Sequence, residues 1–165
     1  MSKVKNIDKS YVKHPRYGDK PVPSGEKISS EDLKRAHWRY NGLKIFPETA
    51  IRADVTKQNY VIYPREIYVD IEEHCRCCGR PFIFFAREQK YWFEVLGFWV
   101  DARCTKCVEC RKKEHEIKRM QMRYQALVTL EERSITESKE LKAIAMELYQ
   151  LGYIKDVRKF SSDLK

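Results

Sequence analysis

Hydrophobic residues in the last third of the chain recur every three or four positions, with charged residues between them. One such stripe consists of Ile117, Met120, Tyr124, Leu127 and Val128. A second consists of Leu141, Ile144, Leu148 and Leu151. This spacing is typical of amphipathic helices whose apolar faces are buried in a core or against a partner. We therefore predict two long helices, and then a shorter one with Tyr153, Val157, Phe160 and Leu164 on one side.

The start of the second of these helices has a recognisable polar signature. Ser134 precedes it, and Glu137 follows three residues later. This is the spacing of a capping box, in which each side chain bonds the backbone amide of the other residue. Gly152 then ends the helix.

A short helix is predicted near the N-terminal end of the chain, in the stretch "EDLKRAHWRY". Leu33, Ala36 and His37 share one face of it. Ser30 is expected to cap its start, and Asn41-Gly42 to stop it.

The region between this helix and the cysteines favours extended structure. The stretch "LKIFPETAIRADVTKQ" predicts an ordered loop anchored by Ile45 and Phe46. The next, "NYVIYPREIYVDI", is rich in residues that favour strands. Pro64 interrupts it, so we predict an edge strand or two short strands rather than a central strand.

The first 29 residues predict an extended arm. The segment "HPRYGDKPVPSG" contains three prolines and two glycines, which is incompatible with a helix. The arm is either disordered or laid over the domain, and Tyr11, Tyr17 and Val22 are its candidate anchors.

Six cysteines indicate metal or redox chemistry if the chain is cytosolic. A cytosolic location is expected because there is no secretory leader and no apolar run long enough to cross a membrane. Cys75 and Cys78 form a C-x-x-C pair followed directly by Gly79. This is the form of a zinc knuckle, in which a tight turn directs two thiolates at one metal ion.

A second pair lies in the stretch "RCTKCVECRK". Cys104, Cys107 and Cys110 are spaced three apart, so either neighbouring pair spells C-x-x-C. Both lie at a distance from the first knuckle that allows a four-thiolate zinc site. The spacing alone therefore leaves two sets of ligands open.

The remaining candidates near this site have other expected roles. Cys77 should point away from the metal, and Cys104 should be a small residue beside it. Either could instead be a reactive thiol, because zinc and nearby arginines lower a thiol pKa; these arginines are Arg76, Arg80 and Arg103. His74 and His115 flank the cluster and are alternative ligands.

The segment "CRCCGRPFIFFAREQKYWFEV" resembles the bacterial "probable zinc-ribbon domain" family. That family shows C-x-x-C-G, an F-x-F or F-x-W strand, a Glu-Gln pair, an aromatic cluster and a final R-C-x-x-C-R. The matching residues are Cys75, Cys78, Gly79, Phe82, Phe84, Glu88, Gln89, Tyr91, Trp92 and Phe93. The resemblance covers residues 74–112. It implies a fold and a metal, but no established biochemical role.

The resemblance also implies a choice between the two cysteine pairs. In the family, a basic residue precedes the second knuckle and an arginine follows it, and Lys106 and Arg111 flank the Cys107–Cys110 pair in this way. The implied ligands are Cys75, Cys78, Cys107 and Cys110, with Cys104 and Cys107 as the alternative second pair.

We expect one structural Zn²⁺ and no enzymatic activity. Four thiolates leave no coordination position for a catalytic water. The sequence contains no phosphate-binding loop, nucleophile elbow or dinucleotide fingerprint. Glu88 and Gln89 are expected to cap backbone amides rather than act as acid and base.

The charge distribution suggests a polyanionic partner. The net charge is +9, made up of +5 over residues 1–40 (10 basic, 5 acidic), −1 over 41–102 (8 and 9) and +5 over 103–165 (15 and 10). Basic flanks suit nucleic acid. Dense aromatic residues between positions 82 and 99 mostly need to pack, but a minority could form a stacking surface. The candidate contacts are Arg76, Arg80, Arg111, Lys112 and Lys113.

We therefore predict an α+β protein with a small zinc ribbon, built of zinc knuckles and short β-strands, at its centre. The expected regions are a basic arm (1–29), a short helix and strand packed on the ribbon (30–73), the ribbon (74–112) and an α-helical tail (113–165). The favoured function is nucleic-acid binding. The alternative is a protein-interaction adaptor, or self-association, through the tail helices.

Overall fold

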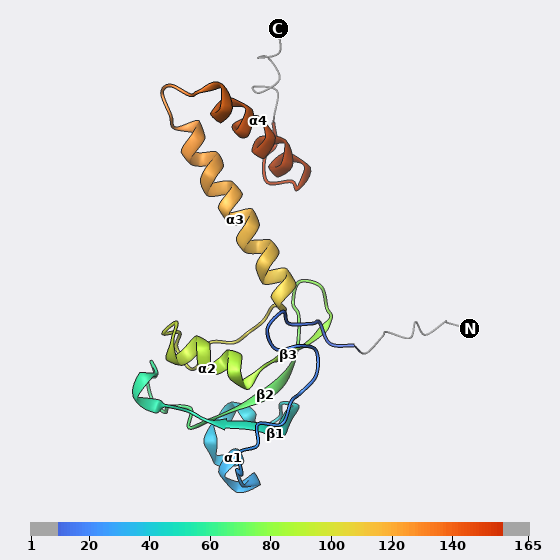
Figure 1. The fold of residues 1–165 in the computed structure, drawn as a ribbon, viewed down its shortest axis with the longest axis vertical. Coiled ribbons are helices and arrows are strands. Elements are labelled where there is room, and N and C mark those ends of the chain that lie inside the picture. Colours follow the sequence, from blue (N-terminus) through green and yellow to red (C-terminus); the bar gives the residue numbers. More distant parts are fainter. Residues whose placement is uncertain (1–9, 157–165) are drawn as a thin grey trace, which may run out of the picture. The chain divides into compact units, whose positions relative to one another are not determined.

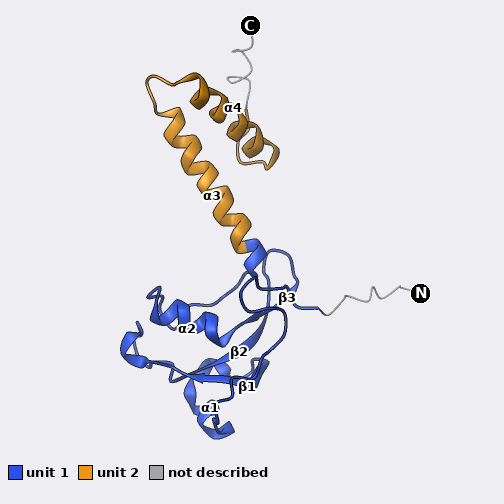
Figure 2. Ribbon diagram, in the orientation of Figure 1, with its two compact units in different colours: residues 1–110 blue, residues 111–165 orange. Residues whose placement is uncertain are grey.

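The computed structural model describes residues 10–156, which divide into two compact units (Figures 1 and 2). Unit 1 comprises residues 1–110 and unit 2 residues 111–165. The elements before the tail are α1 (Ser30–Ala36), η1 (Trp38–Tyr40), β1 (Ile45–Arg52), η2 (Val55–Lys57), β2 (Ile67–His74), β3 (Pro81–Phe84) and α2 (Ala86–Glu94). The tail contains α3 (Val108–Val128) and α4 (Ile135–Gln150). This is the predicted α+β class with C-terminal helices.

The three strands form one antiparallel sheet in the order β1-β2-β3. β1 occupies a segment that was predicted to be a loop, and that prediction is wrong. Its pairing with β2 is irregular between Phe46 and Ile51. There the Thr49 hydroxyl accepts a hydrogen bond from the Asp70 amide (2.9 Å) and donates one to the Phe46 carbonyl (2.7 Å). A side-chain hydrogen bond thus replaces part of the backbone pairing, in a segment that also contains a proline. Neither feature is typical of a strand, so the local sequence does not predict one here.

The two faces of the sheet belong to different hydrophobic clusters, and β2 contributes to both. Ile67, Val69 and Ile71 pack in one cluster with Leu33 and Ala36 of α1. The alternate residue Tyr68 lies in the second. The other buried members of that cluster are Val12, Cys75, Phe82, Phe84, Ala86, Phe93, Val100, Cys104 and Cys107. The period of two along a strand therefore places β2 at the centre of unit 1.

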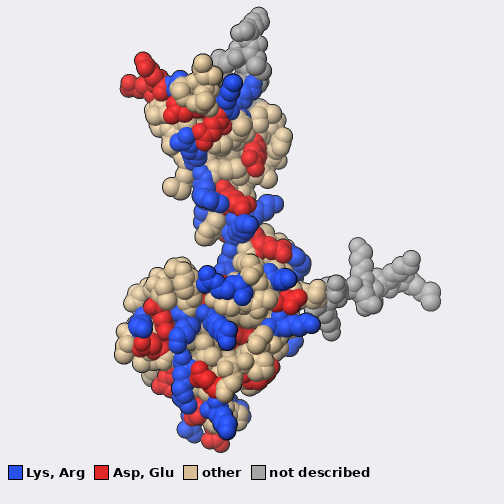
Figure 3. Space-filling model, viewed as in Figure 1, with Lys and Arg blue, Asp and Glu red and all other residues tan. Residues whose placement is uncertain are grey.

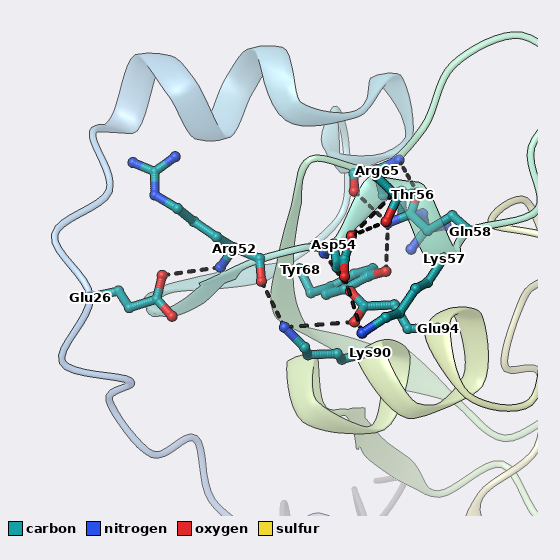
Figure 4. A network of polar contacts seen from close by, with 10 residues as sticks. All are labelled: Glu26, Arg52, Asp54, Thr56, Lys57, Gln58, Arg65, Tyr68, Lys90 and Glu94. Atoms are coloured by element: carbon teal, nitrogen blue, oxygen red, sulfur yellow. Dashed lines mark hydrogen bonds and ion pairs between the residues drawn. The ribbon is translucent and has the colours of Figure 1, made fainter.

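β2 begins at Ile67 and is the central strand of the sheet, so the prediction of an edge strand or two short strands from residue 59 onward is wrong. The Gln58 side-chain nitrogen donates to the Arg65 carbonyl (2.7 Å), and the Arg65 backbone amide donates to the Gln58 side-chain oxygen (2.9 Å). These two bonds close the base of a loop, residues 59–64, as Figure 4 shows for the residues at its base. Tyr60, Tyr63 and the residues between them are exposed. Strand-forming residues are thus displayed on a loop.

Polar contacts fasten the end of β1 to α2 and to the arm (Figure 4). Glu94 accepts a hydrogen bond from the Asp54 amide (2.8 Å), and Lys90 donates to the Arg52 carbonyl (3.1 Å). The Arg52 amide donates to Glu26 of the arm (3.0 Å). These bonds hold α2 against one edge of the sheet.

The described part of the arm lies along unit 1. The Val12 amide donates to the Pro81 carbonyl (2.9 Å), beside β3. Further along, Ser24 bonds to β1 through its amide (to the Glu48 carbonyl, 3.0 Å) and its hydroxyl (to the Ala50 carbonyl, 2.6 Å). Backbone bonds to both outer strands therefore hold it in place.

Two of the three predicted anchors of the arm make contacts. The Tyr11 hydroxyl bonds to Glu72, and the Tyr17 ring lies 5.5 Å from that of Phe85. Val22 is largely exposed, so its predicted role as an anchor is wrong.

The start and end of α1 differ by a few residues from the prediction. The cap is Ser29, whose hydroxyl accepts from the Asp32 amide (3.0 Å), rather than Ser30. The helix ends at Ala36, and a 3-10 turn follows. The predicted buried face is present, because Leu33, Ala36 and His37 are all buried.

Gln89 is fully buried between α2 and the sheet. Its amide nitrogen donates to the carbonyls of Val69 (2.7 Å) and Phe84 (3.0 Å), and its oxygen accepts from Arg65 (3.2 Å). The predicted capping of backbone amides by Gln89 is therefore wrong, since it donates to carbonyls instead.

Unit 2 is built around few buried side chains. Among its described hydrophobic residues, those that are buried are Leu127, Leu141, Ala145 and Leu148. The predicted capping box is confirmed, with Ser134 and Glu137 bonded in both directions. Arg123 and Glu140 join α3 to α4 through two hydrogen bonds of 2.8 and 2.6 Å.

The second predicted stripe is buried only in part. Leu141 and Leu148 are buried and Ile144 is half-buried, but Leu151 is 40% exposed. α4 ends at Gln150, and residues 151–156 are not helical. Val157, Phe160 and Leu164 of the predicted third helix lie outside the described residues. Between residues 10 and 156, no helix is both long and apolar enough to cross a membrane.

Candidate metal centre

The first cysteine pair lies in the turn between β2 and β3. The Gly79 amide donates to the Cys75 carbonyl (2.8 Å), and the Cys75 amide donates to the Arg80 carbonyl (3.0 Å). Gly79 has a φ of 74°, a left-handed conformation that side chains other than hydrogen disfavour. The turn therefore closes tightly, as the C-x-x-C-G pattern predicts, and brings Cys75 and Cys78 to the same side.

The second pair lies at the start of a helix rather than in a second knuckle. Cys107 directly precedes α3, and Cys110 is in its first turn. The helix start supplies backbone amides and the positive end of the helix dipole, both of which favour thiolates. The sequence predicts a second knuckle here, because C-x-x-C alone does not distinguish a knuckle from the first turn of a helix.

The structure brings together the sulfur atoms of Cys75, Cys78, Cys107 and Cys110, all within 4.8 Å of one another. The Cys78 and Cys107 sulfurs are 3.9 Å apart, which is too far for a disulfide. A metal bound tetrahedrally by four sulfurs at about 2.3 Å has sulfur–sulfur edges of about 3.8 Å. The four residues therefore fit a zinc-sized ion.

Ionisation of the first pair is favoured by backbone amides. Burial opposes ionisation of Cys75, but hydrogen bonds from the amides of Cys78, Cys107 and Cys77 outweigh it and lower the pKa to about 6. The Arg80 amide lowers the pKa of Cys78.

The second pair has the opposite tendency. Burial raises the pKa of both Cys107 and Cys110, and neighbouring thiols raise that of Cys110 further. Four thiolates at this separation repel one another, and a divalent cation offsets that repulsion.

The other sulfur and imidazole candidates lie outside the four-cysteine group. Cys104 is buried in the hydrophobic cluster of unit 1 that contains Tyr68, and its thiol donates to the Lys106 carbonyl (3.4 Å). Cys77 is exposed. Within residues 10–156, the four cysteines are the one set of three or more potential metal ligands, and neither His74 nor His115 is among them.

Two of the candidate basic contacts, Arg76 and Arg80, lie in or beside the turn that carries the first cysteine pair. The Arg76 amide donates to the Thr105 carbonyl (2.9 Å), so the first turn lies against the chain that leads to the second pair. Arg80 forms an ion pair with Glu109, so its charge is partly offset by an acidic neighbour. Lys112 and Lys113 are exposed in the first turns of α3.

Arg111 is half-buried beside these lysines. Figure 3 shows Lys and Arg side chains along α3 and across the visible face of unit 1, with acidic residues among them. Within each unit the basic side chains are thus interspersed with acidic ones, and Lys112 and Lys113 lie two and three residues after the candidate ligand Cys110.

Comparison with known proteins supports a metal-binding fold. Residues 69–119 match a family model described as "Probable treble clef domain". The match runs from β2 into α3 and includes all four cysteines. No curated protein and no solved structure matched the chain.

Proposed function

Starting from the treble clef domain at residues 69–119, we propose that the protein binds nucleic acid and that a structural Zn²⁺ holds the binding surface in place. Cys75, Cys78, Cys107 and Cys110 are the proposed ligands. When bound, zinc supplies structural cross-linking rather than catalysis, because four thiolates occupy its coordination sphere. We further propose that the protein has no enzymatic activity and works in the reducing cytosol, where thiolates remain available to the metal.

One observation carries this proposal. Cys107 directly precedes α3 and Cys110 lies in its first turn, and the exposed Lys112 and Lys113 follow two and three residues after Cys110. Cations near a helix start oppose the helix dipole, so they do not stabilise the helix there. Carried by the helix that begins at the second cysteine pair, these lysines are available to contact phosphates.

The test is a fluorescence-anisotropy titration with a mixed-sequence DNA duplex at several salt concentrations. The variant Lys112→Glu/Lys113→Glu should bind at least about tenfold more weakly and should lower the slope of log affinity against log salt by about 2. The control Arg133→Glu/Lys139→Glu makes the same charge change at exposed positions near the other end of α3 and on α4. It should bind nearly as tightly as the unmodified protein, and both variants should retain their metal.

Two results would contradict the proposal. One is absence of binding by the unmodified protein at low salt. The other is equal weakening by both double variants, which would show that only net charge matters.

A second candidate function, a protein-interaction adaptor, is supported by a groove in unit 2. The groove has a volume of about 530 Å³, and its apolar lining comprises Ile117, Met120, Ile144 and Leu151. Its charged lining comprises three basic and two acidic residues, so its chemistry suits an amphipathic helix whose flanks carry charges of both signs. If duplex binding is absent, a pull-down compared between the unmodified protein and Met120→Asp tests this alternative, and equal recoveries from both would reject it.

A further inference from the structure

Unit 1 carries a second surface feature, which lies outside the segment that matches the treble clef family. A groove of about 570 Å³ runs between the α1–η1 segment and the loop 59–64. Two aromatic residues that line it, Trp38 from η1 and Tyr63 from the loop, are 64% and 70% exposed. Aromatic rings of this size usually become buried on folding, so two exposed rings lining one groove need an explanation.

Trp38 is held outside the core by its neighbours. Tyr40, two residues later, is buried and donates from its hydroxyl to the Ile67 carbonyl (2.6 Å). His37 is also buried, and its ring stacks on the indole at 5.6 Å. The Arg39 guanidinium lies 5.3 Å from the indole centre. The turn is therefore fixed on both sides of Trp38, while Trp38 itself stays largely exposed.

Tyr63 is presented by an equally well-defined element. The paired bonds between Gln58 and Arg65 close the base of its loop. Arg65 is itself buried, with its guanidinium 4.9 Å from the centre of the Phe93 ring. Because the base of the loop is anchored in the core, the exposed ring does not result from local unfolding.

The polar groups of the groove are predominantly basic. Lys34 and Arg35, in the last turn of α1, are exposed beside it, and Glu66 is its acidic lining residue. Burial, followed by the charge of Arg65, lowers the pKa of His37 to about 4, so this residue is neutral near pH 7. The Asn41 side chain adds both a hydrogen-bond donor and an acceptor.

Further exposed rings lie beside the other end of the same loop. The Asn59 side chain donates to the Gly97 carbonyl (2.7 Å), and the Val100 amide donates to the Asn59 carbonyl (3.0 Å). These bonds hold residues 95–99 against the start of the loop. The additional exposed rings are Tyr60, Phe98 and Trp99. These rings are close in sequence to the residues that Asn59 joins.

We infer that this groove binds single-stranded nucleic acid, with bases stacked on Trp38 and Tyr63 and phosphates paired with Lys34 and Arg35. Exposed aromatic rings beside cations are the combination that recognises unpaired bases. Bases in a duplex are stacked on one another and do not offer their faces to such rings. The inference rests on the proposed nucleic-acid function but assigns it a second site, whose ligand is a single strand.

The experiment compares Kd values of the full-length, metal-loaded protein for a short, mixed-sequence, fluorescein-labelled DNA single strand. Trp38→Ala and Tyr63→Ala should each weaken binding by about 5- to 100-fold, the range expected for loss of one stacked base. Trp38→Phe should restore most of the affinity, because it keeps a ring at that position. Metal content and melting temperature, measured for every variant, show whether the fold is retained.

A matched control comes from the same loop. Val61 and Ile62 are exposed aliphatic residues between the two tyrosines. Val61→Ser/Ile62→Ser removes apolar surface but no ring, and should leave the Kd for the single strand within about twofold of the original. If this control loses as much affinity as Tyr63→Ala, the loop is an apolar docking surface and the inference is wrong.

The duplex titration with Lys112→Glu/Lys113→Glu separates this inference from the proposed function. If duplex binding depends on these lysines but single-strand binding is unchanged in Trp38→Ala and Tyr63→Ala, the inference about the groove is wrong and the proposed function stands. If single-strand binding depends on both rings and no duplex binding through α3 is found, the inference about the groove is supported. The proposal that Lys112 and Lys113 bind nucleic acid is then wrong. Failure to bind either probe overturns both.

Discussion

Unit 1 and unit 2 bury very different proportions of their hydrophobic side chains. Unit 1 has two hydrophobic clusters on opposite faces of a three-stranded sheet, and a four-cysteine centre at one end of that sheet. The described part of unit 2 buries only four hydrophobic side chains, and in α3 only Leu127 is buried. Unit 1 thus has the core of a small domain, whereas unit 2 has that of a marginal helical hairpin.

This difference indicates where stability originates in each unit. In unit 1 the core is shared between the arm, the sheet and α2, and the metal centre closes the end of the sheet. In unit 2 local signals are more prominent, such as the capping box of α4 and the ion pair between Arg123 and Glu140. We therefore expect unit 1 to respond strongly to metal removal, and unit 2 to changes at single apolar positions.

The largest effect should follow loss of the metal. Cys107→Ser should release zinc and unfold the treble clef, because a structural zinc contributes on the order of 10 kcal/mol to folding in small domains. A strong chelator should have the same effect. All three tryptophans (Trp38, Trp92 and Trp99) lie in unit 1, so their fluorescence reports on that unit selectively.

Cys104→Ser is the control for this prediction. Cys104 is buried outside the metal-binding group and donates to the Lys106 carbonyl, a bond that a serine hydroxyl can also make. This variant should keep one zinc per chain by elemental analysis. Zinc retained in Cys107→Ser but lost in Cys104→Ser would show that the ligand register is wrong.

The next largest effect is expected in the hairpin of unit 2. Leu148 is almost fully buried, and Leu148→Ala should cost about 3 kcal/mol of unfolding free energy through lost burial and the cavity left behind. The measurement is thermal unfolding followed by far-UV circular dichroism. Met146→Ala, at a side chain that is 41% exposed, should change the midpoint much less. Equal shifts in the two variants would contradict the burial of Leu148.

A smaller, pH-dependent effect distinguishes His37 in unit 1. Its pKa falls from 6.5 to about 4 on folding, because burial and the charge of Arg65 disfavour the protonated ring. The unfolded chain therefore binds the extra proton, and stability is lost as pH falls from 6.5 towards 4, by up to about 3 kcal/mol.

His37→Asn should remove this loss, while its side-chain oxygen can still accept from the Arg39 amide. Urea unfolding of the variant and of the unmodified protein is compared at each pH, which cancels contributions common to both, including that of the metal. His115→Asn, at an exposed position on α3, serves as the control. A constant difference between His37→Asn and the unmodified protein across this pH range would contradict the assignment.

The smallest effect is expected from the ion pair of unit 2. Arg123 and Glu140 are both exposed, so water and salt screen their attraction, and Arg123→Gln should barely change the melting temperature. The shift should shrink further at high salt. A large shift that persists in high salt would show that this pair, rather than the buried leucines, holds the hairpin together.

The tail helices, the capping box and the α+β class could be predicted from the sequence alone. Their signals are local, because the helical stripe, the Ser134–Glu137 spacing and the C-x-x-C-G turn each lie within a few residues. The short helix α1 was predicted for the same reason. Of the two second pairs that the cysteine spacing allowed, the family resemblance favoured the one that the structure places with Cys75 and Cys78.

Tertiary contacts decided the remaining features. β1 exists because the Thr49 side chain completes its pairing with β2, and residues 59–64 form a loop because Gln58 and Arg65 close its base. Thr49 bonds to Asp70, which is distant in sequence, and Gln58 and Arg65 are buried polar residues. Neither pairing can be predicted from the local sequence pattern. The groove between Trp38 and Tyr63 was missed for this reason: strand propensity describes each residue, but exposure depends on what the rest of the chain covers.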